Sequence, residues 1–124
     1  MELTRSEEKV MQALWKMGKG FIKDIIPELN EHPAPAYTTV STIVRILEQK
    51  GFVAHHAYGK SHEYYPLISK PEYRRHSFGD LMRNYFDSNP ASVLSFLVQE
   101  EKLTEKDISE IKNIIAQTDK KTEL

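Results

Sequence analysis

The sequence predicts a mainly α-helical chain with one small β-hairpin, divided into two domains. Three observations support this prediction. Apolar residues recur at helical spacing in three segments before residue 51. The period then changes to two on both sides of the turn-forming tetrapeptide 58–61, which predicts two paired strands. Three more helical patterns follow, so we expect one domain over residues 1–69 and a helical domain with a short disordered tail over residues 70–124.

The first helix is expected to begin after Thr4, because Thr4 and Glu7 have the spacing of a capping box. Gly18 interrupts the pattern and should end this helix. Its expected inward-facing residues are Leu3, Val10, Met11, Leu14 and Trp15. A second helix is expected over Phe21–Asn30, and Pro27 should leave it short or bent.

The third helical segment, from Tyr37 to Gly51, has two unlike faces. One face is apolar and consists of Val40, Ile43, Val44 and Leu47, and the opposite face consists of Thr38, Ser41, Thr42 and Arg45. Thr and Ser are weaker helix formers than the Glu and Lys of an ordinary exposed face. A helix in the DNA major groove explains them, since short hydroxyls approach base edges and Arg can donate two hydrogen bonds to guanine. Burial of this face, or a frayed helix start, is the alternative interpretation.

The hairpin is expected to pair residues 52–57 with residues 62–67, and Pro66 should mark the end of its second strand. Three helices followed by a hairpin with a basic tip predict a winged helix-turn-helix domain. In that fold the third helix enters the major groove and the hairpin lies along a phosphate strand or the minor groove. The expected DNA contacts are Thr38, Thr39, Ser41, Thr42 and Arg45 in the groove, with Lys50, Lys60 and Ser61 at phosphates.

The second half predicts three amphipathic helices and no strand. Their starts are signalled by Ser69 with Glu72, by Asn89-Pro90, and by Thr104 with Asp107. A segment of about 50 residues buries too little surface to be secure alone. We therefore expect a homodimer, with docking on the first domain as the alternative. The expected dimerisation residues are Phe78, Leu81, Met82, Tyr85, Phe86, Leu94, Leu97, Ile108, Ile111 and Ile115.

The composition excludes several classes of protein. The 124 residues contain no cysteine, which removes disulfides, thiolate metal sites and cysteine nucleophiles. No apolar run approaches the roughly 20 residues of a membrane span, and the N-terminus is too polar for a secretory signal. We therefore expect a cytoplasmic protein without membrane insertion. The net charge is −1, but between residues 38 and 62 Arg45, Lys50 and Lys60 face only Glu48, so the total does not exclude DNA binding.

No set of residues predicts an enzyme, and we expect no catalytic residue, no cofactor and no metal ion. His55, His56 and His62 lie on the hairpin, and pairing about its turn would bring His56 roughly opposite His62. Histidines with Glu63 could hold a metal, but opposed histidines on an exposed hairpin are common without one. Two alternative functions remain: a winged helix that binds only proteins and not DNA, and a histidine-based metal-responsive regulator on the same scaffold.

The ordered set of motifs resembles the BlaI/MecI family of bacterial repressors, also called the penicillinase repressor family. The matching segments are Ser6–Trp15, Thr39–Val53, Glu63–Ser69 with Glu72-Tyr73, and Glu100–Ile108. The resemblance implies a homodimer of winged helices on a two-fold DNA operator that blocks transcription, with the C-terminal helices forming the dimer. It also implies that a membrane metalloprotease sensor pathway ends repression through cleavage inside the C-terminal part.

The chain departs from the family in two places. The family is cleaved between Asn and Phe, and the aligned pair here is Phe96-Leu97, so cleavage would fail, move or use a protease of different specificity. The copper-responsive branch carries a cysteine cluster near its end. This chain has no cysteine, which excludes release by thiolate-bound copper.

Overall fold

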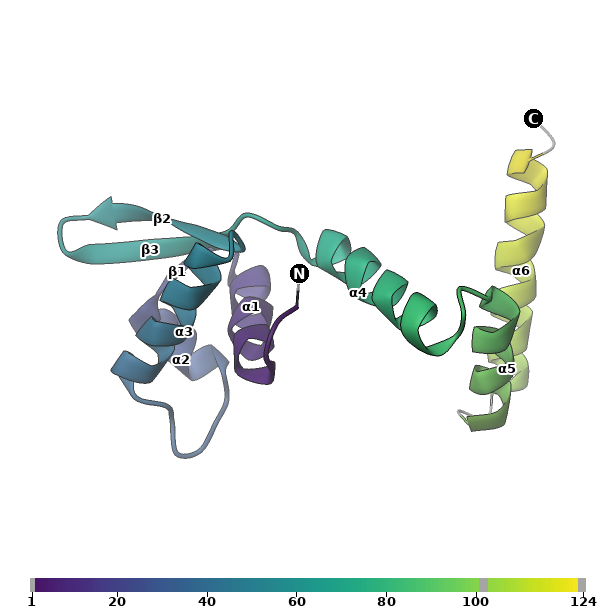
Figure 1. The fold of residues 1–124 in the computed structure, drawn as a ribbon, viewed down its shortest axis with the longest axis horizontal. Coiled ribbons are helices and arrows are strands. Elements are labelled where there is room, and N and C mark those ends of the chain that lie inside the picture. The colour runs from purple at the N-terminus through teal and green to yellow at the C-terminus, as the bar shows by residue number, and fades with distance from the viewer. Residues whose placement is uncertain (1, 101–102, 123–124) are drawn as a thin grey trace. The chain divides into compact units, whose positions relative to one another are not determined.

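The computed structural model describes residues 2–100 and 103–122, with side chains up to Thr118. The chain forms two compact units, residues 1–77 and 78–124, called here the first and second units. In chain order the elements of the first unit are α1 (Arg5–Met17), β1 (Gly20–Phe21), α2 (Ile22–Glu28), α3 (Tyr37–Gln49), β2 (Val53–Tyr58), β3 (Ser61–Pro66) and the start of α4 (Lys70–Tyr85). Figure 1 shows α1, α2 and α3 beside a hairpin of β2 and β3. This mainly helical architecture with a small sheet confirms the predicted fold class.

Helix α1 begins and ends where the sequence indicates. Thr4 Oγ1 accepts a hydrogen bond from the backbone N–H of Glu7, and the Glu7 carboxylate accepts one from the N–H of Thr4, which completes the capping box. At the other end, Gly18 adopts a φ of 84° and donates its N–H to the Leu14 carbonyl. A residue with a side chain would be strained in that conformation.

The sheet contains a strand that was assigned to a helix from the sequence. Gly20 and Phe21 form β1, which pairs antiparallel with β3 through Gly20 opposite Tyr64 and Phe21 opposite Glu63. Helix α2 therefore begins at Ile22, one residue later than predicted, and ends at Glu28 instead of Asn30. It is short, as Pro27 indicated, because proline supplies no backbone N–H to continue the helix.

The hairpin has a register different from the expected one. His56 lies opposite Glu63, and Ala57 lies opposite His62, so the predicted pairing of His56 with His62 is wrong. The reason is the length of the turn. Tyr58 pairs with Ser61, which leaves only Gly59 and Lys60 between the strands. A φ of 63° at Gly59, the first of these two residues, suits a tight two-residue hairpin turn.

One apolar core holds the first unit together. It is formed by residues from all three helices and from the hairpin, so that α3 is fixed by one face only. The buried apolar residues are Val10, Met11, Ala13, Leu14, Ile22, Ile25, Val40, Val44, Leu47, Phe52, Val53 and Tyr64. Trp15 packs against the margin of this core and is partly buried. The predicted apolar face of α3 is thus its core face.

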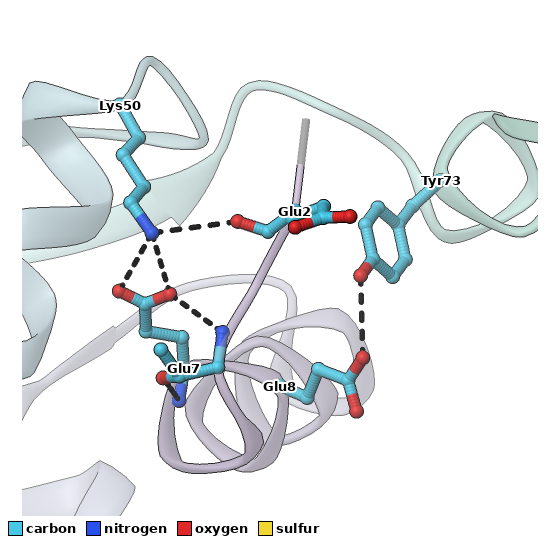
Figure 2. A network of polar contacts seen from close by, with 6 residues as sticks. Glu2, Glu7, Glu8, Lys50 and Tyr73 are labelled. Atoms are coloured by element: carbon cyan, nitrogen blue, oxygen red, sulfur yellow. Dashed lines mark hydrogen bonds and ion pairs between the residues drawn. The ribbon is translucent and has the colours of Figure 1, made fainter. Parts of the chain in front are cut away.

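A polar network joins the N-terminal region to the end of α3 (Figure 2). Glu7 is almost fully buried, and both of its carboxylate oxygens accept hydrogen bonds from the Lys50 ammonium, at 2.7 and 3.0 Å. Lys50 also reaches the backbone carbonyl of Glu2 at 3.4 Å. Burial raises the pKa of Glu7, but the hydrogen bonds from Lys50 and Thr4 outweigh burial and hold that pKa below its ordinary value.

The start of α4 belongs to the first unit. Ser69 caps α4 by accepting the backbone N–H of Glu72, and the indole N–H of Trp15 donates to the Ile68 carbonyl at 2.8 Å. The Tyr73 ring lies 5.7 Å from the Trp15 ring and 5.9 Å from the Phe52 ring, centroid to centroid. The compact winged-helix unit therefore extends past Ser69, the boundary expected from the sequence.

The second unit contains the rest of α4, α5 (Pro90–Glu100) and α6 (Glu105–Thr122). Asn89 caps α5 through the N–H of Ala91, and Thr104 caps α6 through the N–H of Asp107, as the sequence indicated. Neither α4 nor α5 has a buried residue.

The polar tail expected from residue 120 onward is helical as far as Thr122, since α6 ends there. Its last two residues, 123 and 124, lie outside the described residues, as do residues 101 and 102 of the matching segment Glu100–Ile108.

Candidate nucleic-acid interface

The polar face of α3 lies on the outside of the first unit. Thr38, Thr39, Thr42 and Arg45 are exposed, and Ser41 is half-buried. The core residues of α3 are completely buried on the other side of the helix. Burial of the hydroxyl face inside its own domain, the alternative left open by the sequence, is thereby excluded.

The side chains on this face are partly ordered by the helix itself. Thr42 Oγ1 donates to the Thr38 carbonyl at 2.9 Å, and Arg45 Nε lies 3.5 Å from the Ser41 carbonyl. Within the described part of the chain, no ion pair to Arg45 is formed. A guanidinium held by Nε in this way can still present its two terminal nitrogens to a planar pair of acceptors such as guanine O6 and N7.

The N-terminal end of α3 is suited to an approaching anion. Its N-cap is Ala36, which supplies no side-chain hydrogen bond, and its first turn carries no acidic residue. The helix therefore leaves backbone N–H groups at its start, where the helix dipole favours negative charge.

The wing, formed by β2, β3 and their turn, places basic and polar groups next to α3. Lys60 and Ser61 are exposed at its tip. At its base, His55 Nδ1 lies 2.5 Å from the Glu48 carboxylate of α3, and the His55 ring stacks on His62 at 4.1 Å between centroids. The contact between His55 and Glu48 connects the wing to α3. It also gives a partner to the Glu48 carboxylate, which lies three residues after Arg45 in the sequence.

Tyr64 and Tyr65 point to opposite faces of the wing, as their adjacent positions require. Tyr64 is buried in the core, whereas Tyr65 is half-buried and stacks on His56 at 4.9 Å. Burial raises the pKa of the Tyr64 hydroxyl, and the nearby Glu48 carboxylate raises it further, so this tyrosine stays neutral. In the part of the chain that the structure describes, no three His, Cys, Asp or Glu side chains form a group that could hold a metal ion.

Lys50 is the predicted contact that the structure separates from the others. Its ammonium is held by the Glu7 carboxylate and the Glu2 carbonyl (Figure 2). A phosphate contact would have to compete with a nearly buried carboxylate for this ammonium. The phosphate-binding role predicted for Lys50 has no support in this arrangement.

A group of exposed side chains beside the polar face of α3 was not predicted from the sequence. Tyr37 begins α3 and Tyr58 ends β2, and each is 59% exposed. With residues from β1 and α2 they line a hollow of about 320 Å³. The sequence did contain a signal for them. Tyr37 lies at the predicted start of the third helix, and Tyr58 lies at the predicted hairpin turn.

An outward polar helix on a three-helix core, with an antiparallel hairpin beside it, defines a winged-helix protein of the DNA-binding class. The chain belongs to the penicillinase repressor family, whose model matches residues 3–117. This membership confirms the resemblance seen in the sequence.

Individual relatives agree with the family. The chain is 29% identical over 117 residues to the penicillinase repressor of Bacillus licheniformis, a match that covers 92% of this chain and 89% of that protein. It is 23% identical over 114 residues to the methicillin resistance regulatory protein MecI of Staphylococcus aureus strain N315, covering 92% and 93% respectively. The solved DNA-binding domain of the repressor BlaI superimposes with a TM-score of 0.51 and 28% identity, covering 58% of this chain and 88% of that domain.

These findings make the protein a DNA-binding transcriptional repressor of the BlaI/MecI type and a member of a non-enzymatic family. Across the described residues, no helix combines the length and the apolar character needed to cross a lipid bilayer.

Proposed function

We propose that this protein represses transcription as a cytoplasmic homodimer that binds a two-fold operator, with one copy of α3 in each half-site. The observation that carries the proposal is the polar face of α3, whose hydroxyls and guanidinium are turned away from the core. A helix fixed by its apolar face and exposing short polar side chains has the geometry of a recognition helix in the major groove.

Each half-site is bound through two kinds of contact, one to base edges and one to phosphates. Base edges are read by α3, where Arg45 supplies paired donors and the hydroxyls supply short contacts. Phosphates are held at the wing, by Lys60 and Ser61 at its tip. The proposed base-reading residues are Thr38, Thr39, Ser41, Thr42 and Arg45.

The second unit supports the homodimer, because it leaves large apolar side chains exposed. Tyr85 is 77% exposed, Ile115 is 52% exposed and Phe78 is 50% exposed. Leaving such side chains in water is unfavourable, and a second copy of the chain covers them symmetrically. The proposed dimer surface contains Phe78, Leu81, Met82, Tyr85, Phe86, Leu94, Leu97, Ile108, Ile111 and Ile115.

A footprinting and binding experiment tests the proposal. The full chain is titrated against the DNA upstream of its own gene and against a random duplex of the same length, at several salt concentrations. We expect protection of a two-fold sequence, with an affinity that falls as salt rises, because counterions are released on binding. Equal and weak binding to both duplexes would contradict sequence-specific repression and favour a winged helix that binds only proteins.

We further propose that proteolysis of the second unit ends repression. The Phe96–Leu97 bond lies inside α5, and the Phe96 ring is 46% exposed and 5.6 Å from the Phe86 ring, centroid to centroid. A protease needs an extended backbone, so α5 must open locally before cleavage. Cleavage here would separate α6 from the rest of the chain and remove part of the proposed dimer surface. Mass spectrometry of the protein from induced cells tests this, and recovery of intact chains only, with the target genes expressed, would refute it.

A further inference from the structure

A hollow beside the recognition helix is not explained by base reading. It is lined by Phe21, Ile22, Lys23, Tyr37, Tyr58, Ser61 and His62, and its volume is about 320 Å³. These residues come from the β1–α2 junction, from the first residue of α3 and from the tip of the wing. We call this hollow the notch. It therefore lies between the two elements assigned to DNA, and not on a separate face of the unit.

The walls of the notch are aromatic. Tyr37 and Tyr58 are each 59% exposed, and the Phe21 ring lies 6.1 Å from the Tyr58 ring, centroid to centroid. Single exposed aromatic residues are ordinary on protein surfaces. Here rings from three elements converge on one hollow, which provides an apolar surface next to polar groups.

The polar groups of the notch favour an anion. Lys23, Ser61 and His62 are exposed, and each can donate a hydrogen bond. None of the seven lining residues is acidic. Within the described chain the nearby Lys19 is paired with Glu63 at 3.8 Å, whereas no ion pair of Lys23 is formed. The Lys23 ammonium is thus the cation available at this place.

We propose that the notch seats one sugar-phosphate of the operator strand that passes between α3 and the wing. The apolar face of the deoxyribose packs on Tyr37 and Tyr58, and the phosphate lies toward Lys23, Ser61 and His62. A free phosphate would use the donors but not the aromatic walls, which is why the DNA backbone is the better occupant. This inference rests on the proposed function, because it requires α3 to lie in the groove.

The test uses the full-length chain with Lys23→Ala, Tyr37→Ala and Tyr58→Ala, and measures affinity for operator and for random duplex over a range of salt. Lys23→Ala should weaken both duplexes alike and reduce the slope of log affinity against log salt by about one unit. Tyr37→Ala and Tyr58→Ala should weaken both by about tenfold and leave the slope unchanged, since they remove only apolar contact. Lys16→Ala is the matched control, because Lys16 is exposed but paired with Glu28 on another face, and its slope should equal that of the unmodified chain.

Each outcome separates this inference from the proposed function. If the unmodified chain does not recognise an operator, the proposed function fails. If it does, and Lys23→Ala and the more severe Lys23→Glu both keep its affinity and slope, the notch proposal fails while the repressor stands. If Lys23→Ala lowers the affinity for operator DNA alone, the notch proposal also fails, since that pattern belongs to a base-reading residue.

A free anion is tested by competition. If inorganic phosphate displaces DNA more strongly than chloride does at equal ionic strength, and Lys23→Ala abolishes this difference, the notch binds a free anion instead. Thermal melting of each variant confirms that it is folded.

Discussion

The ammonium of Lys50 lies 2.7 Å from one carboxylate oxygen of Glu7 and 3.0 Å from the other, across 43 positions of sequence. Glu7 lies in the first turn of α1, and Lys50 is the C-cap residue of α3, so their ion pair joins the two helices. Because the same carboxylate also completes the capping box with Thr4, one side chain serves both helices. This contact therefore adds a polar link between α1 and α3 to the apolar core packing, and it uses none of the proposed DNA-contacting residues.

We predict that Glu7→Gln lowers the free energy of unfolding at pH 7 by about 1–3 kcal/mol, since hydrogen bonds to a charged partner are lost. The pKa of Glu7 is below its ordinary value of 4.5 in the folded protein. Its contribution is therefore fully present above pH 4.5 and is lost as the pH falls through the folded pKa. Urea titrations at several pH values should show the two proteins converging in acid. A difference that stays constant down to the lowest pH would contradict the ion pair.

Arg45→Ala should cost about 1–3 kcal/mol on the operator and little on random DNA, because it removes base contacts. Gln12→Ala is the control, as Gln12 is also exposed but lies on α1 and does not belong to the proposed reading face. Quantitative gel shifts on both duplexes measure the effect. Equal losses of affinity for operator and random DNA would show that Arg45 contacts only the DNA backbone and reads no base.

Lys60→Ala should weaken binding to all sequences alike and reduce the salt slope by about one unit, because one phosphate contact is lost. Fluorescence anisotropy of labelled duplexes at four or more salt concentrations provides the slope. An unchanged slope would remove the wing tip from the interface.

Ile115→Glu should convert the dimer to a monomer, because it places a charge in the proposed apolar surface. Ser109→Glu adds the same charge at an exposed polar position of α6 and should leave the dimer intact. Sedimentation equilibrium distinguishes the two masses. Dimers that persist in Ile115→Glu would move the interface away from this part of α6.

Truncation after residue 77 should yield a folded monomer with weak operator affinity. Truncation after Ser69 should yield a less stable one, since it removes the Tyr73 ring from between Trp15 and Phe52. Loss of a partly buried aromatic ring costs about 1–3 kcal/mol, which corresponds to a lower melting temperature by several degrees. Equal melting temperatures would show that α4 contributes nothing to the first unit.

Local signals predicted most of the fold. The capping boxes, Gly18 and the two-faced segment from Tyr37 each act over a few residues, so the sequence shows them directly. Features that depend on distant partners were missed. Strand β1 is two residues long and exists only because β3 pairs with it, and no local pattern distinguishes it from the start of α2.

The candidate site divides in the same way. The outward orientation of Thr38, Thr42 and Arg45 follows from helical spacing, and the sequence predicted it. The partner of Lys50 could not be predicted, because Glu7 approaches it only after α1 and α3 pack together. The notch was missed for the same reason, since its residues come from three elements that are separate in the chain.

The indole of Trp15 donates its N–H to the Ile68 carbonyl, in the segment that leads from the wing to α4. Trp15 is the one tryptophan among the 124 residues. Its intrinsic emission is therefore a built-in optical probe of that segment. Detachment of the segment from α1 would expose the ring to water and redden the spectrum, so its docking can be followed in real time without attaching a dye.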